Sequence, residues 1–290
     1  MKQTRQIAIL YKVIFVCLTV VPVMAGLIYA LLYSFGIIGI MNNGFTGKYW
    51  IAVLLSDMFW VSLGYSLYIA LVSITISLVF ALSISLFIKK RNITISYLFY
   101  IPLCFPAVVM AFYSFQLWSK SGWISRIIYQ IGGIKEISSF PDLTNDTLGF
   151  SIVFTSVLMI VPFFTILFSN LYHSEKLHEL KKVAQNLGAS SFQILIKITI
   201  PVLLKRSWFT ICLFIIFVMS SYEIPLLLGK QNPQMISVLT MQKLQRFNLN
   251  DIPQAYTIAS LYVMITIFVL TLLSIGGIKK RFITKRRAYA

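Results

Sequence analysis

The polar stretch KLHELKKVAQNLGASSFQILIKITIP, residues 176–201, separates two long apolar runs of the chain. Its first apolar residues recur at helical spacing, at Leu177, Leu180, Ala184 and Leu187. This spacing predicts a short helix with one apolar edge among lysines. Ser174 and Glu175 suit its start, because a hydroxyl caps free N–H groups and a carboxylate is stabilised by the helix dipole. Gly188 is expected to end it, since glycine adopts a left-handed backbone without strain.

A second helix is expected directly after this glycine. Ser190 and Gln193 have the spacing of a capping box, in which each side chain binds the backbone N–H of the other residue. The apolar residues of this helix are Phe192, Leu195 and Ile196. Pro201 marks where it passes into the next apolar run. The stretch is therefore predicted to form two short helices bent at Gly188.

The rest of the chain indicates a membrane protein. Hydrophobic residues make up 58% of the 290 residues and charged residues only 11%, unlike an ordinary soluble domain. A helix needs about 20 apolar residues to cross a bilayer. Six runs are long enough, near 13–38, 59–88, 93–118, 148–171, 203–228 and 255–278. Residues 10–25 resemble a signal peptide, but the first run continues to Ile38, which favours an uncut helix. The predicted fold is all-α, with six transmembrane helices.

The basic residues orient this fold. Six spans place both termini on one side of the membrane, and most of the 25 lysines and arginines flank the spans on that side. The positive-inside rule then places both termini in the cytoplasm. The same distribution explains the net charge of +17, so membrane lipid is an expected partner and nucleic acid is not.

Residues suited to metal binding or catalysis do not form a set. The cysteines are Cys17, Cys104 and Cys212, which lie far apart in apolar runs and are expected to pack there. His173 and His178 are five residues apart, which leaves them about 140° apart on a helix and predicts solvated histidines rather than zinc ligands. The chain also has no GxxxxGK[ST] phosphate loop. It is therefore expected to be neither an ATPase nor another enzyme, and to hold no cofactor or metal.

The stretch 176–201 resembles the EAA loop of the binding-protein-dependent permeases of ATP-binding cassette (ABC) importers. The family pattern is Glu-Ala-Ala, three residues, Gly, nine residues, Ile, one residue and Leu-Pro. The matching positions are Lys182, Val183, Ala184, Gly188, Ile198, Ile200 and Pro201. The glycine, isoleucine and proline keep their spacing, whereas Lys182 reverses the charge of the usual glutamate.

Other parts of the chain agree with this resemblance. Residues 49–69 look like the entry to the permease core, and SYEIPLLLG at 221–229 resembles the end of the fifth span in the branch that carries polyamines, ferric iron and related small solutes. The resemblance implies a MetI-like fold with a permease core at 48–278, whose coupling loop is 174–201. An N-terminal tail and first span at 1–47 precede the core, and a basic cytoplasmic tail at 279–290 follows it.

The resemblance also implies a mechanism of alternating access. Two permease subunits form the solute pathway, two ATPase subunits bind ATP beneath it, and an extracytoplasmic solute-binding protein delivers the solute. The unusual Lys182 favours a heterodimer of permeases over a homodimer. The expected ATPase-coupling residues are Leu180, Lys182, Val183, Ala184, Leu187, Gly188 and Ala189.

One acidic residue within a predicted span leaves two interpretations open. Glu223 either lines the solute pathway, with Tyr222 and Pro225, or reaches interfacial water near Gly229.

The alternative function is a secondary active transporter without an ATPase. Such a transporter more often has inverted repeats and several ionisable groups within the membrane. An integral-membrane enzyme is disfavoured, because no acid, base or metal residues converge.

Overall fold

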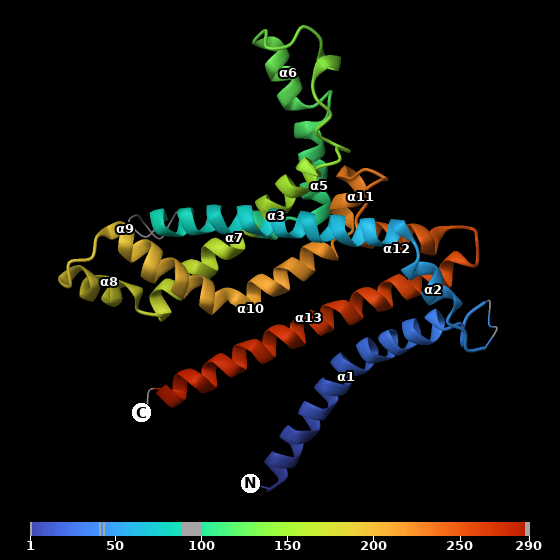
Figure 1. Ribbon diagram of the computed structural model, residues 1–290, viewed down its shortest axis with the longest axis horizontal. Coiled ribbons are helices and arrows are strands. Elements are labelled where there is room, and N and C mark those ends of the chain that lie inside the picture. Colours follow the sequence, from blue (N-terminus) through green and yellow to red (C-terminus); the bar gives the residue numbers. More distant parts are fainter. Residues whose placement is uncertain (1, 41, 43, 89–99, 288–290) are drawn as a thin grey trace. The chain divides into compact units, whose positions relative to one another are not determined.

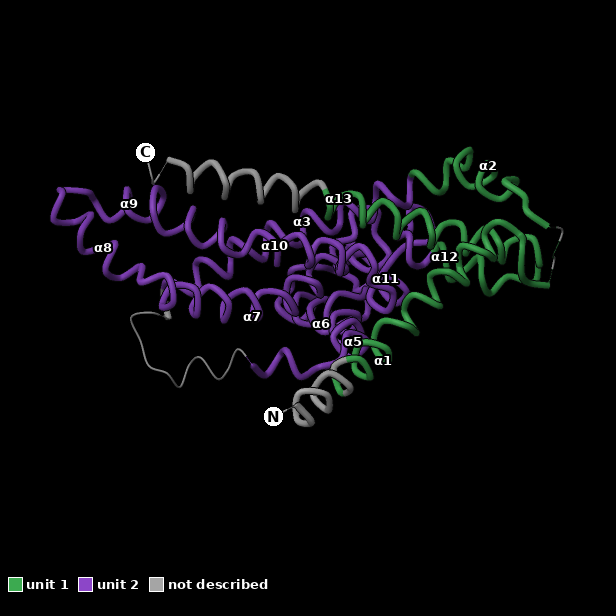
Figure 2. The backbone as a smooth tube through the Cα atoms, turned by 90° about the horizontal axis from the view of Figure 1, so that it is seen from below, with its two compact units in different colours: residues 1–60, 239–290 green, residues 61–238 purple. Residues whose placement is uncertain are grey.

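The computed structural model describes residues 2–40, 42, 44–88 and 100–287, and in this part of the chain all regular secondary structure is helical (Figure 1). This confirms the predicted all-α fold. The chain divides into two compact units, residues 1–60 with 239–290 and residues 61–238 (Figure 2).

The first unit is built on two long helices, α1 (Lys2–Ser34) and α13 (Asp251–Arg287). Both α1 and the short α2 (Lys48–Leu54) pack against α13. The rings of Tyr33 and Tyr256 stack with their centroids 4.5 Å apart, and Tyr29 contacts both. Aromatic side chains thus join α1 to α13, although these helices lie at opposite ends of the sequence.

The second unit contains most of α3 (Asp57–Ile88), together with α5 (Ala107–Trp118), α7 (Phe150–Ser174), α10 (Ile200–Met219) and α11 (Glu223–Leu228). Helix α7 packs against α5, α10 and α11. Phe163 and Phe164 on α7 meet Phe214 on α10, with ring centroids 4.5 and 5.0 Å apart. The hydroxyls of Thr155 and Ser114 are hydrogen-bonded at 2.7 Å, so a polar contact also links α7 to α5.

Short elements connect these helices. They are η1 (Pro102–Cys104), α6 (Trp123–Gln130), η2 (Ile137–Ser139), α8 (Leu177–Asn186), α9 (Ser191–Ile194), the π-helical η3 (Leu195–Thr199) and α12 (Ile236–Gln245). Five helical segments of the described chain are long and apolar enough to span a membrane, Val13–Ser34, Asp57–Leu86, Phe150–Ser174, Ser191–Met219 and Asp251–Thr271.

The predicted third span, 93–118, is not among these five segments. Residues 93–99 lie outside the described residues, and from residue 100 onward the chain forms η1 and then the 12-residue α5. At 1.5 Å per residue, α5 is only about 18 Å long. Phe105 is extended, with φ −86° and ψ 132°, because Pro106 disfavours a helical conformation in the residue before it. The described part of this segment, residues 100–118, is therefore not one continuous spanning helix.

The expected fifth span, 203–228, is wrong at both ends. It begins earlier, because α9, η3 and α10 follow one another without a break from Ser191 to Met219. It also ends earlier, and α11 begins at Glu223. Pro225 has no N–H to offer the Ser221 carbonyl four residues before it. The Ser237 hydroxyl donates to that carbonyl instead, at 2.5 Å.

Candidate functional site

The connection between α7 and α10 starts with a sharp change of direction. The prediction that Ser174 and Glu175 start the next helix is wrong, because α7 continues through Ser174 and α8 begins only at Leu177. The Ser174 hydroxyl donates to the Leu171 carbonyl of its own helix, so it caps nothing in α8. Lys176 makes the turn with a left-handed backbone, φ 49°.

An ion pair joins this turn to α10. Glu175 Oε1 lies 2.7 Å from Arg206 Nε, with Glu175 about one quarter exposed and Arg206 about half exposed, at 26% and 53%. The Glu175 carboxylate lies at the C-terminal end of α7, where the helix dipole disfavours a negative charge. The positive guanidinium of Arg206 offsets this unfavourable interaction. The base of the α7–α10 connection is thereby linked to the fifth span.

The apolar edge of α8 divides into a buried and an exposed part. Leu177 and Ala184 are buried, whereas Leu180, Val183 and Leu187 are 46%, 58% and 83% exposed. At 100° per residue these five side chains cover an arc of about 120°. Leu177 and Ala184 lie at one end of this arc. We call the exposed set, Leu180, Val183 and Leu187, the α8 apolar face.

The end of α8 confirms the predicted glycine. Gly188 has φ 84°, its N–H donates to the Gln185 carbonyl at 2.9 Å, and the Ala189 N–H donates to the Ala184 carbonyl at 3.0 Å. This pair of bonds is the Schellman ending of a helix. A Cβ on Gly188 would meet nothing within 4 Å, so backbone conformation alone favours glycine here.

The predicted capping box is also confirmed. The Ser190 N–H donates to Gln193 Oε1 at 3.0 Å, and the Gln193 N–H donates to Ser190 Oγ at 3.3 Å. Phe192 and Ile196 are exposed in this second helical segment, while Ile194 is buried. Apolar side chains are thus exposed on both sides of the Gly188 bend.

Lys182 lies on α8 among exposed polar residues, away from the apolar face. None of the ion pairs found among the described residues includes it. Within the described part of the chain, the charge that departs from the family pattern therefore has no ion-pair partner.

The three residues expected at a pathway lie together at the break between α10 and α11. Tyr222 precedes α11 and is half-buried, Glu223 is its exposed first residue, and Pro225 is buried. The Leu226 N–H donates to the Tyr222 carbonyl at 3.0 Å, which closes the first turn. Helix α11 packs against α5 and α7. Glu223 is thus at the start of a separate short helix, and not within a continuous span.

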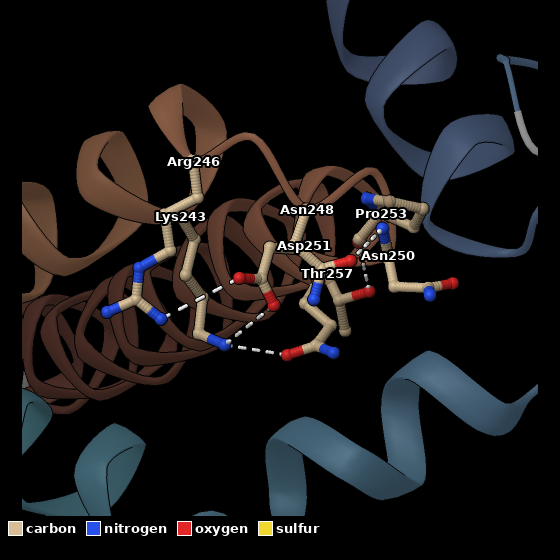
Figure 3. A network of polar contacts seen from close by, with 8 residues as sticks. Lys243, Arg246, Asn248, Asn250, Asp251, Pro253 and Thr257 are labelled. Atoms are coloured by element: carbon tan, nitrogen blue, oxygen red, sulfur yellow. Dashed lines mark hydrogen bonds and ion pairs between the residues drawn. The ribbon is translucent and has the colours of Figure 1, made fainter.

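A polar network in the first unit was missed by the sequence analysis (Figure 3). Lys243 Nζ lies 2.6 Å from Gln254 Oε1 and 3.9 Å from Asp251, and Arg246 lies 3.6 Å from the same carboxylate. The side chains of Lys243 and Asp251 are only 14% and 13% exposed. Burial lowers the pKa of Lys243, and Arg246 lowers it further, while Asp251 acts in the opposite direction. The feature of the sequence that could have indicated this network is the pair Lys243 and Asp251, eight residues apart beside an apolar run.

Histidine and cysteine side chains in the described part of the chain do not form a metal centre. No group of three or more His, Cys, Asp and Glu residues within it could hold a metal ion. His173 lies in the last turn of α7 and His178 in the first turn of α8, and both are exposed. All three cysteines are free, and Cys212 is the buried one.

Comparisons with known proteins agree with this arrangement. Residues 85–288 match the sequence model of a family described as binding-protein-dependent transport system inner membrane component. This match covers more than half of the chain and includes the stretch 176–201. A search of curated proteins gave no match.

Two solved structures resemble the chain over nearly its whole length. One is the crystal structure of a bacterial ABC transporter involved in the import of the acidic polysaccharide alginate, with a TM-score of 0.71, 15% identity, and 96% of this chain and 98% of that chain covered. The other is a bacterial alginate ABC transporter in complex with alginate pentasaccharide-bound periplasmic protein, with a TM-score of 0.65, 17% identity and 92% of each chain covered. At these identities the likeness shows the fold alone.

Proposed function

The chain belongs to the binding-protein-dependent transport system inner membrane components and is a MetI-like permease of an ABC importer, and from this premise we propose how it couples to an ATPase and to its solute. The family is a transport component and not an enzyme. In our proposal the chain carries out no chemistry itself, and ATP is bound by partner subunits.

The α8 apolar face is the observation that carries the coupling proposal. Leu180, Val183 and Leu187 are exposed on a helix that connects two membrane spans but is too polar to enter the bilayer. Apolar side chains grouped on an otherwise charged helix mark a protein contact. The partner is an ABC ATPase, whose cleft covers these residues together with the Gly188 bend.

Coupling also requires that movement of α8 reach the membrane helices. An ATPase can bias the membrane bundle only through contacts that differ between its two states. The pair between Glu175 and Arg206 links the base of the loop to α10, and the unbroken run from Ser191 to Met219 links its other end to the same helix. A shift of α8 is therefore transmitted to the fifth span at two points.

The remaining partners follow from the same proposal. Both termini lie in the cytoplasm, so in this proposal the chain crosses the membrane once more between α3 and α7, and the α7–α10 connection lies on the same side, beside the ATPase. A second permease completes the pathway, and we favour a different chain over a second copy, because Lys182 is unusual. A solute-binding protein delivers the solute from outside, as the periplasmic protein in one similar structure suggests.

For the solute we propose a small cation, such as a polyamine or ferric iron, that passes Tyr222, Glu223 and Pro225. The support is the resemblance of residues 221–229 to that branch and the exposed carboxylate at the α10–α11 break. The similar structures are of alginate transporters, and alginate is an acidic polysaccharide. We expect Glu223→Gln to lower uptake of a cationic solute several-fold at an unchanged amount of complex. Unchanged uptake would exclude a pathway role for the carboxylate, and loss of both would make it structural.

The test of the main proposal is reconstitution. The tagged chain is purified from its native membrane, its co-purifying subunits are identified, and ATP hydrolysis is measured in proteoliposomes with and without the solute-binding protein. We expect an ATPase to co-purify and its hydrolysis to rise with the loaded binding protein. Solute uptake without any ATPase, driven by an ion gradient, would instead establish a secondary transporter.

A further inference from the structure

Helix α6 carries an exposed apolar face that the transport proposal does not use. Trp123, Ile127 and Ile131 follow one another at four-residue spacing through α6 and the residue after it, and they are 62%, 56% and 76% exposed. Ser125, on the other side of the helix, is buried, and its hydroxyl donates to the Gly122 carbonyl at 2.9 Å. The helix therefore rests on the protein through a small polar side chain and turns its large apolar ones outward.

The position of α6 is fixed by a tight turn after α5. A Cβ on Gly122 would lie 2.6 Å from the Gln116 carbonyl oxygen and 2.8 Å from that of Leu117, so only glycine allows this close approach. Within the second unit, α5 and α6 run across the direction of α3 (Figure 1). If α3 crosses the bilayer, α6 runs along the membrane plane. Leu148 and Phe150, where the chain enters α7, are exposed as well.

Basic residues flank the apolar face. Arg126 is exposed on α6, with its Nε donating to the Ser121 carbonyl at 3.0 Å. Lys120 precedes the helix and lies 3.9 Å from Asp142 in an exposed pair, and Lys135 follows it, also exposed. A helix with Trp and Ile on one face and basic groups at its flanks has the character of an interfacial membrane helix.

We propose that α6 lies in the interface of the membrane, with Trp123, Ile127 and Ile131 toward the acyl chains and Lys120 and Arg126 beside lipid phosphates. The topology of the function proposed above places this interface at the outer leaflet, and only this choice of leaflet rests on that function. The same lipid surface would also cover Leu148 and Phe150, which are exposed where the chain enters the span α7. A solute-binding protein, by contrast, is soluble and leaves after delivery, so the face would return to water in each cycle.

This anchoring would hold one end of α5, which packs against α7 and α11. Helix α11 begins with Glu223, so the lipid contact would help to position the residues proposed to meet the solute. The amphipathic segment is thus a support for the α5–α11 packing rather than a docking surface for a soluble partner.

The test uses an environment-sensitive fluorophore on single cysteines in a chain without Cys17, Cys104 and Cys212. The variants are Ile127→Cys, on the apolar face, and Tyr129→Cys, an exposed control about 160° around the helix. The full chain is placed in nanodiscs of phosphatidylcholine and phosphatidylglycerol, with and without brominated acyl chains. We expect a blue-shifted emission and several-fold stronger quenching at position 127 than at position 129.

Equal, water-like emission and weak quenching at both positions would overturn the proposal. So would a blue shift at position 127 that occurs only after the solute-binding protein is added, because the face would then be a docking site for that protein. ATP hydrolysis measured after the co-purified ATPase is added to the same nanodiscs separates the two proposals. Quenching at position 127 without any coupled hydrolysis would keep the interfacial helix and reject the coupling role of α8.

Discussion

The α7–α10 connection and the α12–α13 corner are both charged connections between helices, but they differ in which side chains they bury. The first exposes Leu180, Val183 and Leu187 in helical register and leaves most of its lysines exposed, at positions 176, 182 and 197. The second holds Lys243 and Asp251 nearly buried and pairs them within the chain (Figure 3). Phe247 is exposed there, but in a turn, and single exposed apolar residues are common.

This difference separates the roles of the two regions. A segment whose polar groups are satisfied internally stabilises its own fold, whereas a helix with an uncovered apolar face gains stability only when a partner binds. Substitutions in the α7–α10 connection should therefore change coupling and leave the folded chain intact. Substitutions in the α12–α13 corner should change the stability of the chain and leave coupling per folded molecule intact.

The largest effect is expected from Gly188→Val. A left-handed backbone costs a residue other than glycine about 1–3 kcal/mol, and more for a β-branched one. Because the site has open space, backbone strain is the only penalty, and it would move α8 away from its docked position. We expect uptake to fall about tenfold or more, since about 1.4 kcal/mol is a factor of ten.

The control for this change is Gly188→Asn, because asparagine tolerates the left-handed region. Uptake per assembled complex is compared for both variants, with the amount of chain in the membrane measured by immunoblot. Normal uptake by the valine variant would remove Gly188 from the coupling site.

The next effect is expected from Asp251→Asn, which leaves Lys243 nearly buried without its carboxylate. The loss should cost about 1–3 kcal/mol of stability, seen as a lower thermal unfolding temperature of the purified chain. Burial already lowers the pKa of Lys243, so its charged form is destabilised in the folded state, and the substitution removes the group that opposes this shift. The stability deficit should therefore shrink as the pH rises through the lowered pKa toward about 10.4, where unfolded lysine also loses its proton.

The control at this corner is Arg246→Gln. Arg246 is half exposed, so its pair with Asp251 is screened by solvent and its loss should lower the unfolding temperature less. An Asp251→Asn variant that unfolds at the wild-type temperature at every pH would show that the network does not stabilise the corner.

A smaller effect is expected when the pair of Glu175 and Arg206 is broken. Exposed ion pairs contribute about 0–1 kcal/mol, so Glu175→Arg or Arg206→Glu alone should reduce uptake only a few-fold. The double exchange restores opposite charges and should recover most of the uptake. Recovery is the decisive readout, because a purely local packing defect in either variant would add up in the double variant instead.

The smallest effect is expected from Lys182→Glu, which restores the residue of the family pattern. Lys182 has no ion pair among the described residues, and we expect its charge to act on the ATPase. We expect a modest change in ATPase affinity that fades as salt rises, because screening shortens the reach of surface charges. The affinity is measured by titrating the ATPase onto nanodiscs at low and high ionic strength.

The features that the sequence predicted correctly are local ones. Gly188 and the capping box of Ser190 and Gln193 depend on bonds between residues at most five apart, and the apolar runs follow from composition alone. The end of the fifth span depends on a distant residue, because Ser237 satisfies the carbonyl that Pro225 leaves free. The pattern of apolar residues in the sequence does not predict such a contact.

The same limit applies to the candidate site. Helical spacing placed Leu177 and Leu187 on one edge, but only packing decides that the first is buried and the second is exposed. The network around Lys243 was missed for a related reason. Its members become neighbours when α12 and α13 fold against each other, and their spacing in the sequence matches no motif.

Burial of the α8 apolar face by an ATPase can be measured directly by cysteine labelling. Leu187→Cys lies on this face, and His178→Cys is an exposed control on the opposite side of α8. Both are made in a chain without the native cysteines and treated with a hydrophilic maleimide in nanodiscs, with and without the ATPase. We expect the ATPase to slow labelling at position 187 about tenfold or more and to leave position 178 nearly unchanged, as for a residue at the core of an interface. Equal labelling rates at position 187 with and without bound ATPase would show that α8 does not dock there.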